Sequence, residues 1–277
     1  MKYADLHIHT HYSDSTFSPE EVVACAGDKA LSAIAICDHD CVDGIEPTIE
    51  AAASLNADIE IIPGIEMTVE KQDAEIHILG YFIDYKAGWF RKKLQEIQAA
   101  RIERIYEMIK KLDAAGINVR PENVFGFAGK GTIGRLHLAQ AMLKTGKVKN
   151  FREAFGEYIG FQKPCYVPHV KFSPEEAIKT ILKVGGVPAL AHPALMGKDE
   201  YIPELIGYGL RAIEVYHTDH KPSMVKHYEE FAVSHGLLMT GGSDCHGMGK
   251  GRVLIGTIRV PYELVERLRE EAKKIRQ

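Results

Sequence analysis

The sequence predicts an α/β protein whose strands form a closed or incomplete barrel of the (β/α) type, with helices on the outside. Three observations support this prediction. Short apolar strands alternate with amphipathic helices, which is the order that produces a parallel sheet. The segment at 31–37 is apolar at nearly every position, as in a strand buried on both faces. The strands are also numerous enough to close a barrel, with an open doubly wound sheet as the structural alternative.

The composition is that of an ordinary soluble globular protein. The 277 residues are 45% hydrophobic and 26% charged, and they allow one large domain or one domain with a second inserted in it. A formal net charge of -4 argues against a general affinity for nucleic acids or membranes, although a nucleotide substrate stays possible. The five cysteines form no CxxC pair, so we expect no disulfide framework. With no signal peptide and no apolar run of about 18 residues, we expect a cytoplasmic protein without membrane or obligate protein partners.

The N-terminal elements follow from local signals. The strand at 3–9 precedes a Ser-Pro-Glu-Glu segment, in which Ser18 can cap a helix, Pro19 suits its first turn and Glu21 completes a capping box. We predict strands at 3–9, 31–40, 59–70 and 75–82, and helices at 18–30 and 45–55.

The C-terminal elements repeat this order, beginning with a second Ser-Pro-Glu-Glu helix start at 173–176. We predict strands at 186–193, 211–217, 237–246 and 254–260, and helices at 172–184, 201–208, 223–236 and 261–275. The alternation implies that the strands lie parallel to one another in a single sheet.

One segment interrupts the alternation. Between residues 87 and 165 the sequence contains no convincing strand, but it contains a long charged amphipathic helix at 89–116 that ends at Gly116. Shorter helices are predicted at 133–146 and 151–160. We therefore expect a barrel formed by 1–86 and 166–277, and a helical insertion at 87–165 that covers the active site.

Side chains that bind metals stand where the predicted strands end. His7 and His9 are two apart on a strand and therefore project from the same face. In a parallel barrel the carboxyl ends of the strands share one face, where active sites form. The candidate metal ligands are His7, His9, Asp14, His39, Glu66, His77, His192, Asp244 and His246. Asp38 and Asp40 flank His39 and are candidates for carboxylates that orient the ligands.

The number and type of these ligands indicate the chemistry. One ion uses about four protein ligands, so nine ligands imply two or three ions. Imidazole and carboxylate groups without a cysteine favour Mn²⁺, Zn²⁺ or Fe²⁺. Such clusters activate water and hold both oxygens of an in-line phosphoryl displacement. The sequence therefore predicts hydrolysis of a phosphoester.

Taken together, these segments resemble the PHP family, the polymerase and histidinol phosphatase domain. The motifs DLHIHTHYSDS, CDHD, PGIEM, EIHILG, AHP and GGSDCH occur in the family's order between residues 5 and 246. The resemblance implies a distorted (β/α)7 barrel, similar to a TIM barrel, with a metal cluster that is often trinuclear. Within the family, the chain is most similar to stand-alone phosphoesterases with a helical insertion. Some of these act on nucleoside 3',5'-bisphosphates and on 5'-phosphorylated oligonucleotides.

The resemblance also implies how the ligands are shared among the ions, with Mn²⁺ as the metal we expect first. One ion would be held by His7, His9, Glu66 and Asp244. Glu66 would bridge to a second ion, which His77 and His192 also bind, and a third would be held by Asp14, His39 and His246. A bridging water or hydroxide would be the nucleophile, because the metals lower its pKa.

Three further residues are predicted to act on the substrate. The segment IGRLHLAQAM resembles the part of the family in which an arginine and a histidine face the substrate, here Arg135 and His137. Arginine offers a planar fork to phosphate, and His137 can bind phosphate or protonate the leaving oxygen. The alternative for both is a surface helix with a salt bridge. His217 follows a predicted strand and is the third candidate, and weaker candidates are His169, Lys163 and Lys171.

We therefore predict a metal-dependent phosphoesterase that acts on a nucleoside 3',5'-bisphosphate or a 5'-phosphorylated oligonucleotide. A histidinol-phosphate phosphatase would use the same chemistry in a different pocket. A non-catalytic metal-binding module is the alternative from another class, but the ligand set is complete here. Amidohydrolases also begin with HxH on a barrel, although many of them bridge their metals with a lysine where this chain has Glu66.

Overall fold

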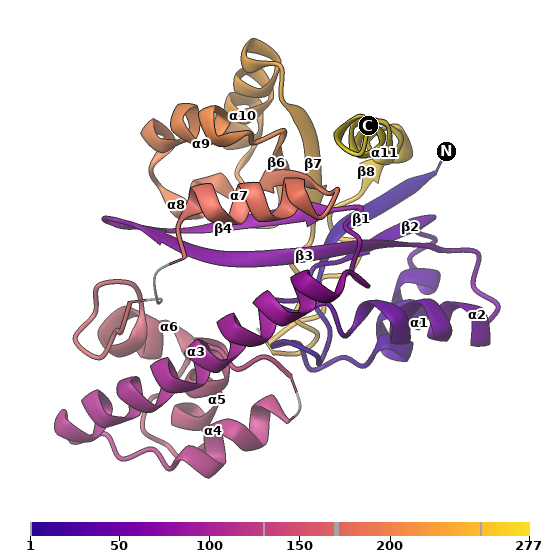
Figure 1. The fold of residues 1–277 in the computed structure, drawn as a ribbon. Coiled ribbons are helices and arrows are strands. Elements are labelled where there is room, and N and C mark those ends of the chain that lie inside the picture. Colours follow the sequence, from indigo (N-terminus) through magenta and orange to yellow (C-terminus); the bar gives the residue numbers. More distant parts are fainter. Residues whose placement is uncertain (1, 130, 169–171, 250) are drawn as a thin grey trace.

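The computed structural model describes residues 2–129, 131–168, 172–249 and 251–277. The strands are β1 (Tyr3–Ile8), β2 (Ala33–Ile36), β3 (Glu60–Lys71), β4 (Ala74–Tyr81), β5 (Val187–Leu190), β6 (Ala212–His217), β7 (Leu238–Gly242) and β8 (Val260–Pro261). They form one sheet in the order β7-β6-β5-β4-β3-β2-β1-β8, which curls into a nearly closed barrel with helices around it (Figure 1). A single pairing of Ile8 with Cys245 brings the end of β1 beside the segment after β7. The predicted α/β barrel is confirmed.

β4 departs from the prediction that the strands are all parallel, because it runs antiparallel to both β3 and β5. Only Gln72 and Asp73 join β3 to β4, and so short a connection can only reverse the chain. His77 pairs with Thr68 in β3. Although it stands near the beginning of its own strand, His77 therefore lies at the same end of the barrel as Glu66.

The strand predicted at 254–260 is wrong except for its last residue. Only Val260 and Pro261 pair with β1, and they pair in the antiparallel direction. The preceding backbone bonds to side chains instead of to a neighbouring strand. The Gly256 N–H donates to Asp5 Oδ2 at 2.9 Å, and Gly256 itself has a φ of +72° that turns the chain. The buried Asp5 also accepts the Ser243 N–H at 2.8 Å, so it joins β1 to both of these loops.

The helices that surround the barrel are α1 (Pro19–Asp28), α2 (Ile45–Ser54), α7 (Pro174–Lys183), α8 (Pro193–Met196), α9 (Ile202–Tyr208), α10 (Pro222–His235) and α11 (Tyr262–Ile275), with a 3-10 turn, η2, at Asp199–Tyr201. Both predicted capping boxes are confirmed, since Ser18 and Ser173 each accept a backbone N–H three residues on. None of the helices in the described residues has the length and apolar composition that crossing a membrane requires.

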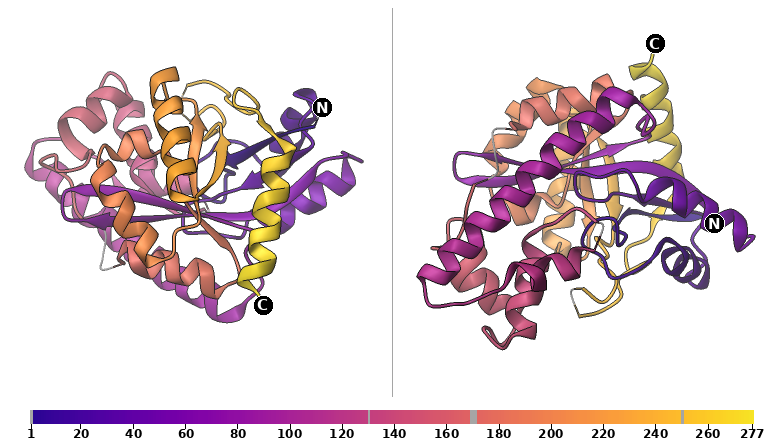
Figure 2. Two further views of the ribbon diagram at one scale, coloured as in Figure 1. Left: turned by 90° about the horizontal axis from the view of Figure 1, so that it is seen from above. Right: turned by 60° about the horizontal axis from the view of Figure 1, so that its bottom comes forward.

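The residues between β4 and α7 form a group of helices with its own core. These are α3 (Gly88–Ala114), α4 (Pro121–Ala128), α5 (Arg135–Lys144), α6 (Phe151–Glu153) and the π-helical segment η1 (Ala154–Ile159). Met108, Leu112 and Leu138 belong to a cluster of buried side chains drawn from this segment. Figure 2 shows the shorter helices of this group on one side of the barrel, while the long helix α3 extends along it. That 87–165 forms a separate domain stays a prediction.

The closest approach between β1 and β7 yields a test of barrel closure. A Cβ on Gly242 would overlap the backbone nitrogen and the Cβ of His7. We expect Gly242→Ala to lower the free energy of unfolding by about 1–3 kcal/mol, as overpacking does, because the two strands must separate. Urea unfolding measures this loss. In the control, Gly207→Ala in α9, the added Cβ meets nothing within 4 Å and should be neutral or stabilising by up to about 1 kcal/mol. Equal stability of the two variants would contradict the closure.

Candidate active site

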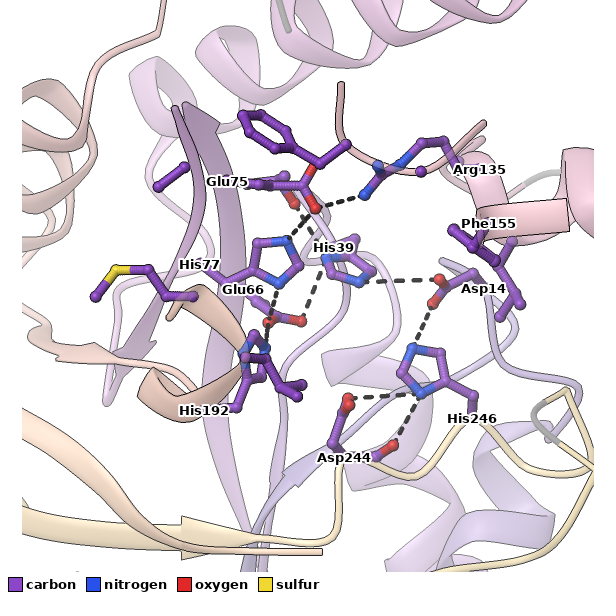
Figure 3. Close-up of a pocket in the computed structure, with 18 of the residues that line it drawn as sticks. Asp14, His39, Glu66, Glu75, His77, Arg135, Phe155, His192, Asp244 and His246 are labelled. Carbon is purple, nitrogen blue, oxygen red and sulfur yellow. Dashed lines mark hydrogen bonds and ion pairs between the residues drawn. The ribbon is translucent and has the colours of Figure 1, made fainter. Parts of the chain in front are cut away.

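The nine side chains predicted as metal ligands converge at one end of the barrel. Figure 3 shows how most of them point into a common space. His7, His9 and Asp14 come from β1 and the loop after it. His39 lies in the segment after β2, Glu66 in β3 and His77 in β4, and the segments after β5 and β7 supply the last three. Strands remote in sequence therefore place their polar residues together, as the barrel prediction required.

Glu66 is the centre of this cluster. Its side chain is buried, and each of its two oxygens faces more than one imidazole. Glu66 Oε2 lies 3.3 Å from His7 Nε2, 3.2 Å from His9 Nε2 and 3.3 Å from His39 Nδ1. Glu66 Oε1 lies 2.7 Å from His77 Nδ1 and 3.1 Å from His192 Nε2. One carboxylate thus touches five histidines, as expected of a group that bridges cations.

Asp14 and Asp244 extend the cluster on either side of His246. Asp14 Oδ1 lies 3.2 Å from His246 Nε2, and Asp14 Oδ2 lies 3.8 Å from His39 Nε2. Asp244 Oδ1 lies 3.5 Å from His246 Nδ1 and 3.2 Å from His9 Nε2. Alternating carboxylates and imidazoles therefore form a continuous network, part of which Figure 3 shows.

These donors fit divalent cations on two observations. First, three groups each bring their ligand atoms within 4.8 Å of one another: His7, His9, Glu66 and Asp244; His9, Asp14, His39 and His246; and His39, Glu66 and His77. Second, several buried ligand atoms have no hydrogen-bond partner, namely His7 Nε2, His9 Nε2, Asp14 Oδ1 and Glu66 Oε2. A buried polar atom without a partner is costly, and metal coordination would remove that cost.

The cluster strongly shifts the pKa values of its members. Burial acts to lower the pKa of His9, but the carboxylates of Asp244 and Glu66, each 3.2 Å from its Nε2, prevail and raise it to about 9. Burial also acts to lower the pKa of His77, but the negative charge of Glu66 raises it to about 10. Burial acts to raise the pKa of Glu66, yet the charges of His39 and His77 hold it well below its ordinary value. The protons on His9 and His77 offset part of the carboxylate charge, as divalent cations would, whereas burial lowers the pKa values of His39 and His192.

Two of the clustered residues have strained backbones. His192 has a φ of 26°, and Asp244 has a φ of 51°. Residues other than glycine rarely adopt positive φ, and each such residue costs of order 1–3 kcal/mol. The strain turns both side chains toward the cluster at the points where β5 and β7 end.

Asp38, predicted as an orienting carboxylate, holds the loop that carries Asp14. It accepts the Thr10 N–H at 2.7 Å, the Thr10 hydroxyl at 2.7 Å and the Ser13 hydroxyl at 2.6 Å. These three hydrogen bonds hold the loop after β1 in place, and so they fix the position of Asp14 in the cluster.

Asp40, the other predicted orienting carboxylate, connects the barrel to the insertion through Arg101 of α3. Arg101 Nε donates to Asp40 Oδ2 at 2.7 Å, and Arg101 Nη2 donates to Thr68 Oγ1 at 2.9 Å. The Thr68 hydroxyl lies 3.3 Å from His39 Nδ1. A third donation from Arg101 reaches the Ile133 carbonyl at 3.3 Å. Thus α3 is fixed to the cluster through two polar side chains.

A pocket of about 750 Å³ lies over the cluster, and residues of the insertion line its other wall. Arg101, Arg104 and Arg135 bring three guanidinium groups to this wall, beside the carboxylate of Glu75 and the apolar ring of Phe155. The Arg135 guanidinium lies 5.7 Å from the centroid of the Phe155 ring and 5.5 Å from that of Tyr166. Arg135 also forms an ion pair with Glu75, which Figure 3 shows above His77.

The other two residues predicted to act on substrate, His137 and His217, are buried beside the pocket, and His217 contacts the cluster. His137 is buried in the first turn of α5, where its Nδ1 accepts the Gly134 N–H at 3.1 Å. His217 is buried at the end of β6, and its Nε2 lies 3.6 Å from Asp244 Oδ2. Among the described residues, neither histidine lines the pocket, nor does Lys163. Direct roles for His137 and His217 in the reaction stay predictions, while His169 and Lys171 lie outside the described residues.

Three important residues escaped the sequence analysis. Glu214 is a fully buried carboxylate in the middle of β6. Its presence inside a mostly apolar strand could have indicated a functional role from the sequence. Arg101 and Arg104 are three apart on α3 and therefore share one face of the helix. The spacing of the two arginines was visible in the sequence. On a helix with so many charged residues, however, a buried pair of arginines looks the same as a face exposed to solvent.

Comparisons with known proteins agree with this geometry. The PHP domain model matches residues 5–160. The chain is 32% identical over 257 residues to a 3',5'-nucleoside bisphosphate phosphatase of Chromobacterium violaceum, covering 91% of this chain and 90% of that protein. It is 29% identical over 247 residues to the 5'-3' exoribonuclease Rnm of Escherichia coli, covering 87% and 84%. A crystal structure from Bifidobacterium adolescentis, described as a predicted metal-dependent phosphoesterase, has a TM-score of 0.87 at 28% identity and covers 97% of this chain and 96% of that one. The resemblance inferred from the motifs is confirmed.

The raised histidine pKa values predict that metal binding releases protons. At about pH 7, His9 and His77 are protonated in the protein alone, since their pKa values are about 9 and about 10. A bound cation needs their nitrogen lone pairs, so Mn²⁺ should displace these protons and bind more weakly as the pH falls. Calorimetric titration in buffers of different ionisation enthalpy counts the protons released. His77→Gln should release fewer protons, whereas the exposed His227→Gln should match the wild type. Binding without proton release would contradict this prediction.

Proposed function

This chain belongs to the PHP domain family of enzymes and is a metal-dependent phosphoesterase, and on that premise we propose that it removes the 3'-phosphate from a nucleoside 3',5'-bisphosphate. The observation that carries the proposal is the pocket of about 750 Å³, which has the histidine and carboxylate cluster on one wall and Arg101, Arg104 and Arg135 on the other. A bisphosphate has two anionic groups, and this pocket offers each of them a positively charged wall once metals are bound.

The cluster would hold two or three cations, with Mn²⁺ expected first. We assign one ion to His7, His9, Glu66 and Asp244, a second to Glu66, His77 and His192, and a third to Asp14, His39 and His246. The grouping of the donor atoms supports the first and the third sets, and the unpartnered ligand atoms belong to the same sets. For the second set, the group of close donor atoms joins Glu66 and His77 to His39, and His192 is included because its Nε2 lies 3.1 Å from Glu66 Oε1. When bound, the ions would supply Lewis acidity and lower the pKa of a water molecule that attacks the phosphorus.

Among the three arginines, Arg135 is the best placed to receive a phosphate. Arg101 is buried and already donates to Asp40, Thr68 and the Ile133 carbonyl. The Arg135 guanidinium lies 5.7 Å from the centroid of the Phe155 ring and 5.5 Å from that of Tyr166, and it forms an ion pair with Glu75. We infer that a substrate phosphate replaces Glu75 or binds beside it, because guanidinium matches phosphate in a bidentate geometry.

A 5'-phosphorylated oligonucleotide is the second candidate substrate. Leu195 of α8 lines the pocket and is 56% exposed, so the pocket reaches the surface there and a longer chain could follow it out. The similarity to the Escherichia coli exoribonuclease also supports an oligonucleotide substrate. Histidinol phosphate is less suitable, because its cationic amine would face the three arginines. The similar proteins are named as a nucleoside bisphosphate phosphatase and an exoribonuclease, which favours a nucleotide substrate over histidinol phosphate and an enzyme over a non-catalytic module.

Phosphate release from adenosine 3',5'-bisphosphate tests the proposed function. The Mn²⁺-loaded wild type should release the 3'-phosphate, and Arg135→Ala should lower kcat/KM about 10- to 100-fold. The reason is that a charge-assisted hydrogen bond to phosphate contributes about 1.5–3 kcal/mol. The control is Arg120→Ala, which removes an exposed arginine at the start of α4 and should keep the wild-type rate.

Two parallel assays separate the alternatives. If the metal-loaded protein leaves the bisphosphate intact but shortens a 5'-phosphorylated RNA, the second candidate replaces the first. Release of phosphate from histidinol phosphate alone would contradict both nucleotide substrates. An Arg135→Ala variant as active as the wild type would overturn the assignment of Arg135 to the phosphate.

A further inference from the structure

Glu214 connects two histidines that the proposed function assigns to different ions. It lies in the middle of β6, and its side chain is fully buried. Glu214 Oε1 lies 3.0 Å from His7 Nδ1. Glu214 Oε2 accepts the backbone N–H of His192 at 2.8 Å. Both oxygens of one carboxylate are therefore engaged, each by a different strand end of the cluster.

The contact with His7 determines which ring nitrogen carries the hydrogen. An ionised carboxylate can only accept hydrogen bonds, so His7 must carry its hydrogen on Nδ1 to make this contact. In the neutral imidazole the lone pair is then on Nε2, the nitrogen that faces Glu66 Oε2 at 3.3 Å and Asp244 Oδ1 at 3.6 Å. The contact with Glu214 thus leaves the lone pair of His7 directed at Glu66 and Asp244, the residues with which His7 would share a metal ion.

The contact with His192 supports a strained backbone. His192 has φ 26° and ψ 60° in the two-residue connection between β5 and α8. Such conformations persist only where surrounding interactions hold them. The hydrogen bond from the His192 N–H to a buried charged oxygen is of the strong kind, so it can hold the backbone in this conformation. Consequently the ring of His192 points at Glu66, with its Nε2 at 3.1 Å from Glu66 Oε1.

We propose that Glu214 is a positioning residue of the metal centre: it sets the tautomer of His7 and the backbone of His192, and so places a ligand for each of two ions at once. This inference rests on the metal dependence in the proposed function, but not on the identity of the substrate.

Glu214→Gln tests the inference with little change in shape. A carboxamide has one acceptor and one donor side, so it cannot accept from both partners. In one orientation its NH₂ faces His7 Nδ1, which must then accept and put its hydrogen on Nε2, where it blocks coordination. In the other orientation the NH₂ opposes the His192 N–H. Either way, calorimetry should show Mn²⁺ affinity reduced about 10- to 100-fold, the range typical when a partner of a metal ligand is removed.

Two controls separate positioning from a general loss of structure. Glu60→Gln makes the same change in β3, where Glu60 accepts from Arg269 and Tyr262, and Mn²⁺ affinity should stay that of the wild type. In a His7→Gln background, Glu214→Gln should weaken Mn²⁺ binding by a smaller factor than in the wild type, because part of its effect passes through His7. In addition, nitrogen-15 spectra of histidine in the Zn²⁺-loaded wild type should show His7 carrying its hydrogen on Nδ1.

The outcomes distinguish this inference from the proposed function. Wild-type Mn²⁺ affinity in Glu214→Gln, or a hydrogen on Nε2 of His7, would overturn the role of Glu214 and leave the phosphatase proposal intact. Weakened Mn²⁺ binding in Glu214→Gln, combined with no phosphate release from the bisphosphate by the wild type, would support Glu214 and overturn the substrate. Failure of the wild type to bind Mn²⁺ would overturn both.

Discussion

The buried carboxylate of Glu66 lies within 3.3 Å of nitrogen atoms from five histidines, and the rest of the site is arranged around this contact. Five imidazoles around one carboxylate repel one another wherever they are protonated, and they leave lone pairs without partners wherever they are neutral. Divalent cations resolve both problems, because each binds lone pairs of neutral imidazoles and adds the positive charge that the carboxylates require. The geometry of the barrel end therefore fits the binding of divalent cations.

Holding so many polar groups together requires a rigid surround, and buried side chains one layer further out supply it. Asp38 fixes the loop of Asp14, Glu214 connects His7 to His192, and Arg101 connects the insertion to the barrel. Each of these groups is buried and hydrogen-bonded, which is the condition under which a buried charge is tolerated. The same contacts that keep the interior stable thus determine where the ligand atoms point.

Arg101 and its neighbours also explain how the insertion takes part in function. The helices of the insertion have their own core, yet α3 reaches the barrel through Asp40 and Thr68. Arg135 comes from the same segment and faces the cluster across the pocket. A wall that the insertion supplies can differ between family members while the metal centre stays the same, so we expect substrate preference to reside in this wall.

The sequence by itself determined the barrel, the family and the nine clustered side chains, because hydrophobic alternation and strand-end motifs are local properties. It placed His7 and His9 on one face, and the short connection between β3 and β4 was a local signal for the antiparallel course of β4. It could not show that 254–260 is mostly loop, since the Gly256 N–H bonds to the side chain of Asp5, which is remote in sequence. Only the tertiary structure identified Glu214 and Arg101 as buried partners of the cluster. The physical reason is that burial and the choice of hydrogen-bond partner depend on which distant segments meet, and no local pattern contains that information.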